Sequence, residues 1–180
     1  MITYVSMLRG INVGGQKKIK MEELKKIYES LGLKFVKTYI QSGNVIFQYS
    51  NTNTTRLAEK IESKIKQYFK FDVSVLIRTK SEFHNVIENN PFCNKDPSKT
   101  LVTFLSNNPS DIPKDDINKL KDKSEEIVIH GKQIYLFFPN GYGKSKLNNM
   151  FFEKKLKVTA TTRNWKTVSA LYDIVNSMNA

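Results

Sequence analysis

The stretch Tyr4-Val5-Ser6-Met7-Leu8-Arg9-Gly10-Ile11-Asn12-Val13-Gly14-Gly15-Gln16-Lys17-Lys18 decides how the first half of this chain folds. It opens with apolar residues on both faces of a predicted strand, which is typical of a central strand covered on both sides. The strand leads into a loop with three glycines, and a helix is predicted from Met21. Because glycine has no Cβ, such a loop allows backbone N–H groups to come close to a ligand. The stretch therefore predicts a strand, a candidate binding loop and a helix.

Downstream of this stretch, the order of predicted elements occurs twice. Further strands are predicted at 34–40, 44–49 and 72–79, with helices at 55–69 and 81–87. After a linker-like stretch with Asn and Pro, strands are predicted at 100–105, 126–130, 133–138 and 158–161, with helices from Pro113, at 145–156 and after Asn164. Each half therefore reads strand-helix-strand-strand-helix-strand-helix.

This order predicts an α+β fold made of two ferredoxin-like (βαββαβ plus helix) repeats with antiparallel sheets. We place the first ferredoxin-like subdomain at residues 1–90, a linker at 91–99 and the second ferredoxin-like subdomain at 100–180. The repeat is one of element order, because the residues of the two halves are not alike.

The composition gives a formal net charge of +12, which suggests nucleic acid or another polyanion as a partner. Of the 29 basic residues, however, all but four are lysine, and asparagine is also abundant. AT-rich coding enriches both residue types without selection for binding. The sequence leaves open whether the charge reflects binding or coding.

The expected cellular location follows from the apolar runs, the N-terminus and the cysteine content of the sequence. No apolar run is long enough to span a membrane, and no signal peptide is visible. Cys93 is the single cysteine, so neither an intrachain disulfide nor a Cys-based zinc site is possible within the chain. We expect a cytoplasmic protein that does not associate with membranes.

Four stretches combine glycine or tight turns with polar side chains: residues 9–18, 41–44, 141–149 and 161–165. They contain no Asp, Glu, His or Cys, so they offer neither metal ligands nor a carboxylate pair for acid–base catalysis. We therefore expect no metal and no cofactor, and whether the protein is an enzyme stays open. The remaining cations, amides, hydroxyls and glycines suit phosphate or carboxylate oxygens. These candidate ligand-binding residues are Arg9, Gly10, Asn12, Gly14, Gly15, Gln41, Ser42, Asn44, Lys144, Ser145, Lys146, Asn148, Arg163 and Asn164.

Each stretch also has a structural interpretation. Glycines permit tight turns, and the Asn164 side chain can cap a helix. Gly143-Lys144-Ser145 is not a P-loop, because Phe138 stands where that motif needs glycine. The third strand does not match the pattern of RNA-recognition domains, although contact with a phosphate backbone through basic loops stays possible.

The same stretches resemble a known family. Leu8-Arg9-Gly10-Ile11-Asn12-Val13-Gly14-Gly15, Thr38-Tyr39-Ile40-Gln41-Ser42-Gly43-Asn44-Val45, Ser145-Lys146-Leu147-Asn148-Asn149 and Ala160-Thr161-Thr162-Arg163-Asn164-Trp165 are similar to signature stretches of the bacterial domain of unknown function 1697 family. The resemblance implies an α+β fold with two related subdomains. It implies no established activity.

The predicted topology gives these stretches positions. In the first half, residues 9–18 and 41–44 should share one edge of the sheet, so that Arg9 or Asn12 approaches the second stretch. In the second half, residues 141–146 and 161–164 should be neighbours, each at the start of a helix. Lys144, Lys146 and Arg163 would then form an electropositive pocket.

If these edges face each other, a basic cleft between the two subdomains would bind a small anionic, phosphate-bearing ligand. Two alternatives stay open: a nucleic-acid-binding protein that contacts the phosphate backbone, and a structural or interaction protein without a ligand site. The sequence does not determine the identity of the ligand or the oligomeric state.

Overall fold

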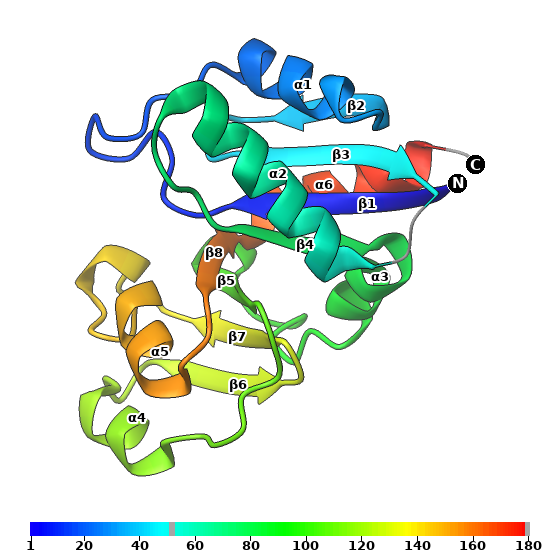
Figure 1. Cartoon of the computed structure of the whole chain (residues 1–180). Helices are drawn as coiled ribbons and strands as arrows, with labels where there is room; N and C mark the ends of the chain where they lie inside the picture. Colours follow the sequence, from blue (N-terminus) through cyan, green and yellow to red (C-terminus); the bar gives the residue numbers. More distant parts are fainter. Residues whose placement is uncertain (51–52, 179–180) are drawn as a thin grey trace. The chain divides into compact units, whose positions relative to one another are not determined.

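The computed structural model describes residues 1–50 and 53–178 of the chain. By packing, the chain divides into two compact units. The first contains Met1–Ile87 together with the segment from Ala170 onward, and the second contains Glu88–Ser169. The strand-helix-strand-strand-helix-strand-helix order predicted for each half is confirmed (Figure 1).

The first unit is built on a four-stranded sheet in the order β2-β3-β1-β4, in which all neighbouring strands are antiparallel. Its strands are β1 (Ile2–Leu8), β2 (Lys34–Tyr39), β3 (Asn44–Tyr49) and β4 (Val75–Thr79), and its helices are α1 (Met21–Ser30), α2 (Thr54–Phe69) and α3 (Lys80–Glu88). Helices α1 and α2 cover one face of the sheet (Figure 1). Each presents a buried apolar stripe at helical spacing, such as Leu57, Ile61 and Ile65 of α2.

The second unit repeats this topology, with the strand order β6-β7-β5-β8 and antiparallel neighbours. Its elements are η1 (Pro97–Lys99), β5 (Thr100–Leu105), α4 (Lys114–Leu120), β6 (Glu126–His130), β7 (Gln133–Phe137), η2 (Tyr142–Lys144), α5 (Asn149–Leu156) and β8 (Ala160–Asn164). Apolar residues of α4 and α5, among them Ile117 and Phe152, form one core with Leu136 of the sheet. The predicted pair of ferredoxin-like antiparallel repeats is confirmed.

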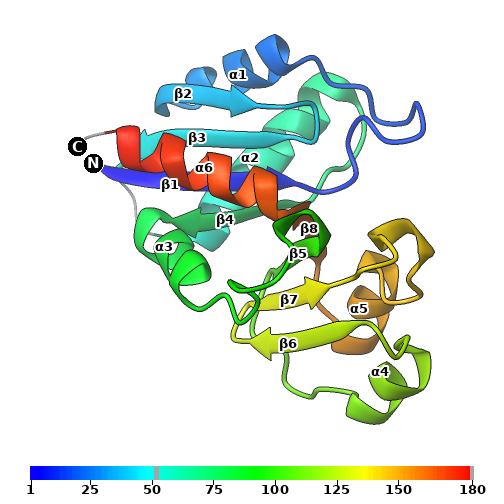
Figure 2. The same cartoon turned by 180° about the vertical axis from the view of Figure 1, so that it is seen from behind.

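The last helix, α6 (Trp165–Ser177), continues from the second unit into the first. Its part from Ala170 onward packs with the first unit, on the sheet face opposite α1 and α2 (Figure 2). Tyr4 and Leu8 of β1 belong to the core formed with α1 and α2, so by alternation Val5 and Met7 lie on the opposite face, where both are fully buried. The predicted subdomain limits, 1–90 and 100–180, stay a prediction, but packing assigns the end of α6 to the first unit.

Three predicted boundaries are wrong. Strand β4 begins at Val75 and not at residue 72. Helix α5 begins at Asn149 and not at Ser145, because the Asn148 side chain caps it by accepting a hydrogen bond from Phe151 N at 3.1 Å. Strand β8 covers Ala160–Asn164 and not 158–161.

Two features were sought among the described residues, a membrane-spanning helix and a group of metal ligands. No described helix is long and apolar enough to cross a membrane. Within residues 1–50 and 53–178, no group of three or more His, Cys, Asp or Glu side chains is placed to hold a metal ion.

Candidate functional site

The loop after β1 is a small β-hairpin. Val13 pairs with Gln16, and Gln16 N donates to Val13 O at 3.0 Å. Gly14 and Gly15 both have a positive φ, 57° and 75°, as a two-residue type I′ turn requires. The glycine pair therefore has a structural role, and the tip that it forms is exposed.

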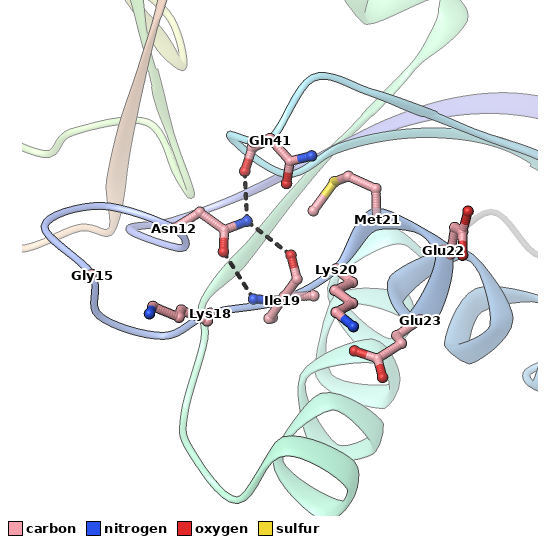
Figure 3. Close-up of a pocket in the computed structure, with 9 residues that line it drawn as sticks. All are labelled: Asn12, Gly15, Lys18, Ile19, Lys20, Met21, Glu22, Glu23 and Gln41. Carbon is pink, nitrogen blue, oxygen red and sulfur yellow. Dashed lines mark hydrogen bonds between the residues drawn. The ribbon is translucent and has the colours of Figure 1, made fainter.

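Asn12 fastens this hairpin to the neighbouring turn. Its Nδ2 donates to Ile19 O at 2.9 Å and to Gln41 O at 2.8 Å, and its Oδ1 accepts from Ile19 N at 2.8 Å (Figure 3). The prediction that Asn12 approaches the 41–44 stretch is confirmed. Because both amide hydrogens are used, the Asn12 side chain serves to hold the loop in place.

The turn between β2 and β3 packs tightly against the end of β1. Leu8 N donates to Gly43 O at 2.8 Å. Gly43 has φ +78°, and a Cβ at this position would lie 2.6 Å from Ile11 Cδ1. Within the turn, Asn44 Nδ2 donates to Ser42 Oγ at 3.0 Å. These contacts fix the turn and leave Gln41 exposed beside the hairpin.

A groove of about 880 Å³ lies where the hairpin, the turn and the start of α1 meet (Figure 3). It is lined by Asn12, Gly15, Lys18, Ile19, Lys20, Met21, Glu22, Glu23 and Gln41. Three of these, Asn12, Gly15 and Gln41, are among the predicted ligand-binding residues. The structure thus brings the two predicted stretches of the first half to one groove.

The charges around the groove are mixed. Lys18 and Lys20 line it together with Glu22 and Glu23, which belong to the first turn of α1. The sequence interpretation missed these carboxylates because the candidate stretch ended at Lys18, three residues before the helix. The signal was present, since acidic residues are favoured in the first turn of a helix. Lysines can hold phosphate oxygens, and carboxylates can accept hydrogen bonds from ligand hydroxyl groups.

The remaining candidates of the first unit lie close to these elements. Arg9 is half-buried at the end of β1, and its backbone N–H donates to Ser74 O at 2.9 Å. Gly10 follows it and is exposed, with φ +66°. At the base of the hairpin, Lys17 Nζ donates to Asp72 O at 2.6 Å.

In the second unit, the two predicted stretches are neighbours, as expected. The hydroxyl oxygens of Tyr142 and Thr162 lie 3.3 Å apart. Asn149 joins them, because its backbone N–H donates to Tyr142 Oη at 3.1 Å and its Oδ1 accepts from Thr162 Oγ1 at 2.6 Å. These bonds tie the segment before α5 to β8.

Arg163 does not take part in this cluster, so the expected pocket of Lys144, Lys146 and Arg163 is wrong. Successive residues of a strand point to opposite faces of the sheet, and Thr162 occupies the face of α5. The Arg163 side chain is therefore on the other face, where it is 7% exposed and donates to Thr161 Oγ1 at 2.9 Å. Burial lowers its pKa to about 10, which leaves it charged at neutral pH.

The other candidates of the second unit have local roles or are exposed. Ser145 Oγ accepts from Leu147 N at 3.1 Å, and Asn164 caps α6 by accepting from Thr167 N at 2.8 Å. Asn148 caps α5 as described above. Lys144 and Lys146 are exposed in the segment before that helix. The cleft that would join residues of both halves stays a prediction.

Comparison with known proteins gives a family and a fold. A family model described as "Protein of unknown function (DUF1697)" matches residues 1–135, which include the hairpin and the β2–β3 turn. The solved structure of the conserved bacterial protein SP0830 from Streptococcus pneumoniae superposes with a TM-score of 0.75 at 27% sequence identity. That similarity covers 97% of this chain and 98% of the other. No curated protein matches the sequence.

Proposed function

The chain belongs to the DUF1697 family of proteins of unknown function, and we propose that it binds a small phosphate-bearing ligand in the groove of its first unit. The observation that supports this most is the meeting of Lys18, Lys20 and the start of α1 at one groove. Its volume of about 880 Å³ falls within the range of small-molecule sites, which is about 300–1,000 Å³.

The position of the groove favours an anionic group. The first N–H groups of a helix have no partner within the helix, and the helix dipole adds positive potential there. Exposed Lys18 and Lys20 supply two cations beside this helix start. A phosphate is the ligand group that fits such surroundings.

The carboxylates narrow the ligand class. Glu22 and Glu23 would repel a long polyanion that lay along the groove, but they can accept hydrogen bonds from sugar hydroxyl groups. A sugar phosphate or a mononucleotide carries both kinds of group. The net charge of +12 keeps a nucleic acid as the second candidate, which would contact the protein through its phosphate backbone.

Ligand-dependent thermal unfolding tests the proposal. Inorganic phosphate, a sugar phosphate and a nucleoside monophosphate are each added to the full chain, and the melting temperature is measured. A ligand at one hundred times its Kd stabilises the folded state by about 2.7 kcal/mol, which corresponds to a rise of roughly 5–11 °C for a chain of this size.

Matched variants locate the site. Lys18→Gln and Lys20→Gln should each reduce the ligand-induced shift, whereas Lys26→Gln on the exposed surface of α1 should leave it unchanged. The proposal fails if millimolar ligand gives no shift, or if all three variants behave alike. Binding of single-stranded DNA or RNA that weakens steeply with salt would instead support the second candidate.

A further inference from the structure

Strand β2 forms an edge of the first sheet and carries exposed apolar side chains at both ends. The strand order places β2 outside β3. Phe35 near its start is 65% exposed, and Ile40, directly after its last residue, is 46% exposed. Between and beside them, Lys34 and Lys37 are exposed as well. We call Lys34, Phe35, Lys37 and Ile40 the β2 edge.

Phe35 lies in a β-bulge and has an unusual backbone conformation. Lys34 pairs with Gln48 and Lys37 with Ile46, so two residues of β2 oppose one residue of β3. Phe35, the first residue of the bulge, has φ +52°. Glycine is the usual residue of a bulge with this left-handed conformation, because a Cβ is strained there. A phenylalanine is a rare choice at this position.

Ile40 repeats the same combination. Its φ is +50°, and a β-branched residue is strongly disfavoured in this region. Both residues therefore have a strained backbone and an apolar side chain that is exposed to water. A glycine or asparagine would relieve the backbone at either position and remove the exposed apolar area. Neither backbone conformation nor burial therefore favours phenylalanine and isoleucine at these two positions.

We propose that the β2 edge is a docking surface for an extended acidic segment of a partner protein, separate from the groove and its ligand. Such a segment can add a strand beside β2 through backbone hydrogen bonds, as in other cases of strand addition. Five residue steps of about 3.3 Å in a regular strand span about 16 Å, and the bulge shortens this, so Phe35 and Ile40 lie within reach of one short strand.

The charges select the partner. Lys34 and Lys37 flank Phe35 on the edge, and the whole chain carries a net charge of +12, so carboxylates in the partner are attracted. Pairing of β2 with β2 of a second copy would bring these lysines together, and like charges opposite one another are destabilising. The surface therefore favours an acidic partner over a second copy.

A pair of synthetic peptides tests this proposal on the full chain. One alternates Glu and Val, and its control alternates Lys and Val, so that only the sign of the charge differs. Amide chemical shifts are followed by NMR during titration. We expect the Glu–Val peptide to shift the amides of residues 34–40, and the Lys–Val peptide to leave them unchanged.

Variants separate docking from folding. Phe35→Gly should retain or raise the melting temperature, because it relieves the left-handed strain, and should weaken binding of the Glu–Val peptide at least tenfold. Val13→Ser removes another exposed apolar side chain and should leave binding unchanged. Absence of binding, equal binding by Phe35→Gly, or a wild-type dimer that Phe35→Gly dissociates would each overturn the proposal.

Discussion

Substitution of Asn12 distinguishes a structural role for this side chain from a ligand contact. Asn12→Gly removes the bonds to Ile19 O, Ile19 N and Gln41 O, and keeps the backbone at φ +55° unstrained. Each hydrogen bond contributes about 1 kcal/mol, but the bond to Gln41 is exposed and the other two are part-buried. We therefore expect a loss of about 2 kcal/mol in the free energy of unfolding.

Asn12→Ala adds a second effect. Glycine adopts the left-handed region without strain, whereas the Cβ of alanine is strained there, so Asn12→Ala should be less stable than Asn12→Gly by about 1 kcal/mol. At roughly 2–4 °C per kcal/mol, the melting temperature should fall by about 4–8 °C for glycine and about 6–12 °C for alanine.

A local measurement accompanies the melting curves. The Ile19 amide donates to Asn12 Oδ1, so its hydrogen exchange should become faster in both variants. The opposite pattern would refute the reasoning: weaker phosphate binding in Asn12→Gly, with an unchanged melting temperature and unchanged protection of the Ile19 amide. Asn12 would then contact the ligand and contribute nothing to the loop.

Three further outcomes follow from the structure. In denaturant melts, Gly43→Ala should lower the free energy of unfolding by about 2–4 kcal/mol, because the new Cβ would lie 2.6 Å from Ile11 Cδ1 and the positive φ adds strain. Gly32→Ala is the control: no atom lies within 4 Å of its new Cβ, so it should lose only about 1 kcal/mol. Burial raises the pKa of the Glu62 carboxyl in the folded state above its value in the unfolded chain. The protonated carboxyl therefore contributes to the free energy of unfolding in full below the unfolded-state pKa, and this contribution is lost as pH rises through the folded-state pKa. Glu62→Gln keeps an acceptor for Val75 N, so its free energy of unfolding should rise relative to that of the wild type as pH increases from acid to neutral. A difference between the two proteins that does not vary with pH would contradict this. Tyr142→Phe removes the acceptor of Asn149 N and should destabilise the second unit by about 1 kcal/mol, measured by faster exchange of the Asn149 amide; unchanged exchange would contradict a role for this hydroxyl.

Periodicity and turn residues predicted the order of elements because those signals are local. The strands β3 and β5 have the predicted bounds, 44–49 and 100–105. The start of α5 was wrong because both Ser145 and Asn148 can cap a helix, and the sequence does not show which one does. In the structure Ser145 Oγ bonds Leu147 N within a turn, and Asn148 makes the cap.

The error for Arg163 follows from a displaced strand boundary. With a strand at 158–161, Arg163 would fall in a loop at the sheet edge, where it could join Lys144 and Lys146. The strand includes Arg163, and alternation along it decides the face on which the guanidinium lies. By contrast, the approach of Asn12 to Gln41 was predictable, because it depends on strand direction alone.

Comparison of equivalent positions in the two repeats distinguishes residues that the shared fold requires from residues that are candidates for function. Arg78 pairs with Val5 across β4 and β1, and Arg163 pairs with Val102 across β8 and β5. Both arginines are buried, and burial lowers the pKa of each to about 10. The residue after each arginine caps the next helix, since Thr79 Oγ1 accepts from Glu82 N and Asn164 Oδ1 accepts from Thr167 N. A feature that occurs at the same place in both halves is most simply a requirement of their shared fold.

The connection between the first strand and the first helix differs between the halves. In the first unit it contains the Gly14-Gly15 hairpin and borders the groove. In the second unit, residues 106–113 connect β5 to α4 and contain Pro109 and Pro113 but no glycine. A type I′ turn needs positive φ at both central residues, so the glycine pair allows the first connection to fold back beside the β2–β3 turn. The groove, where we propose the ligand site, therefore lies in a connection in which the two repeats diverge.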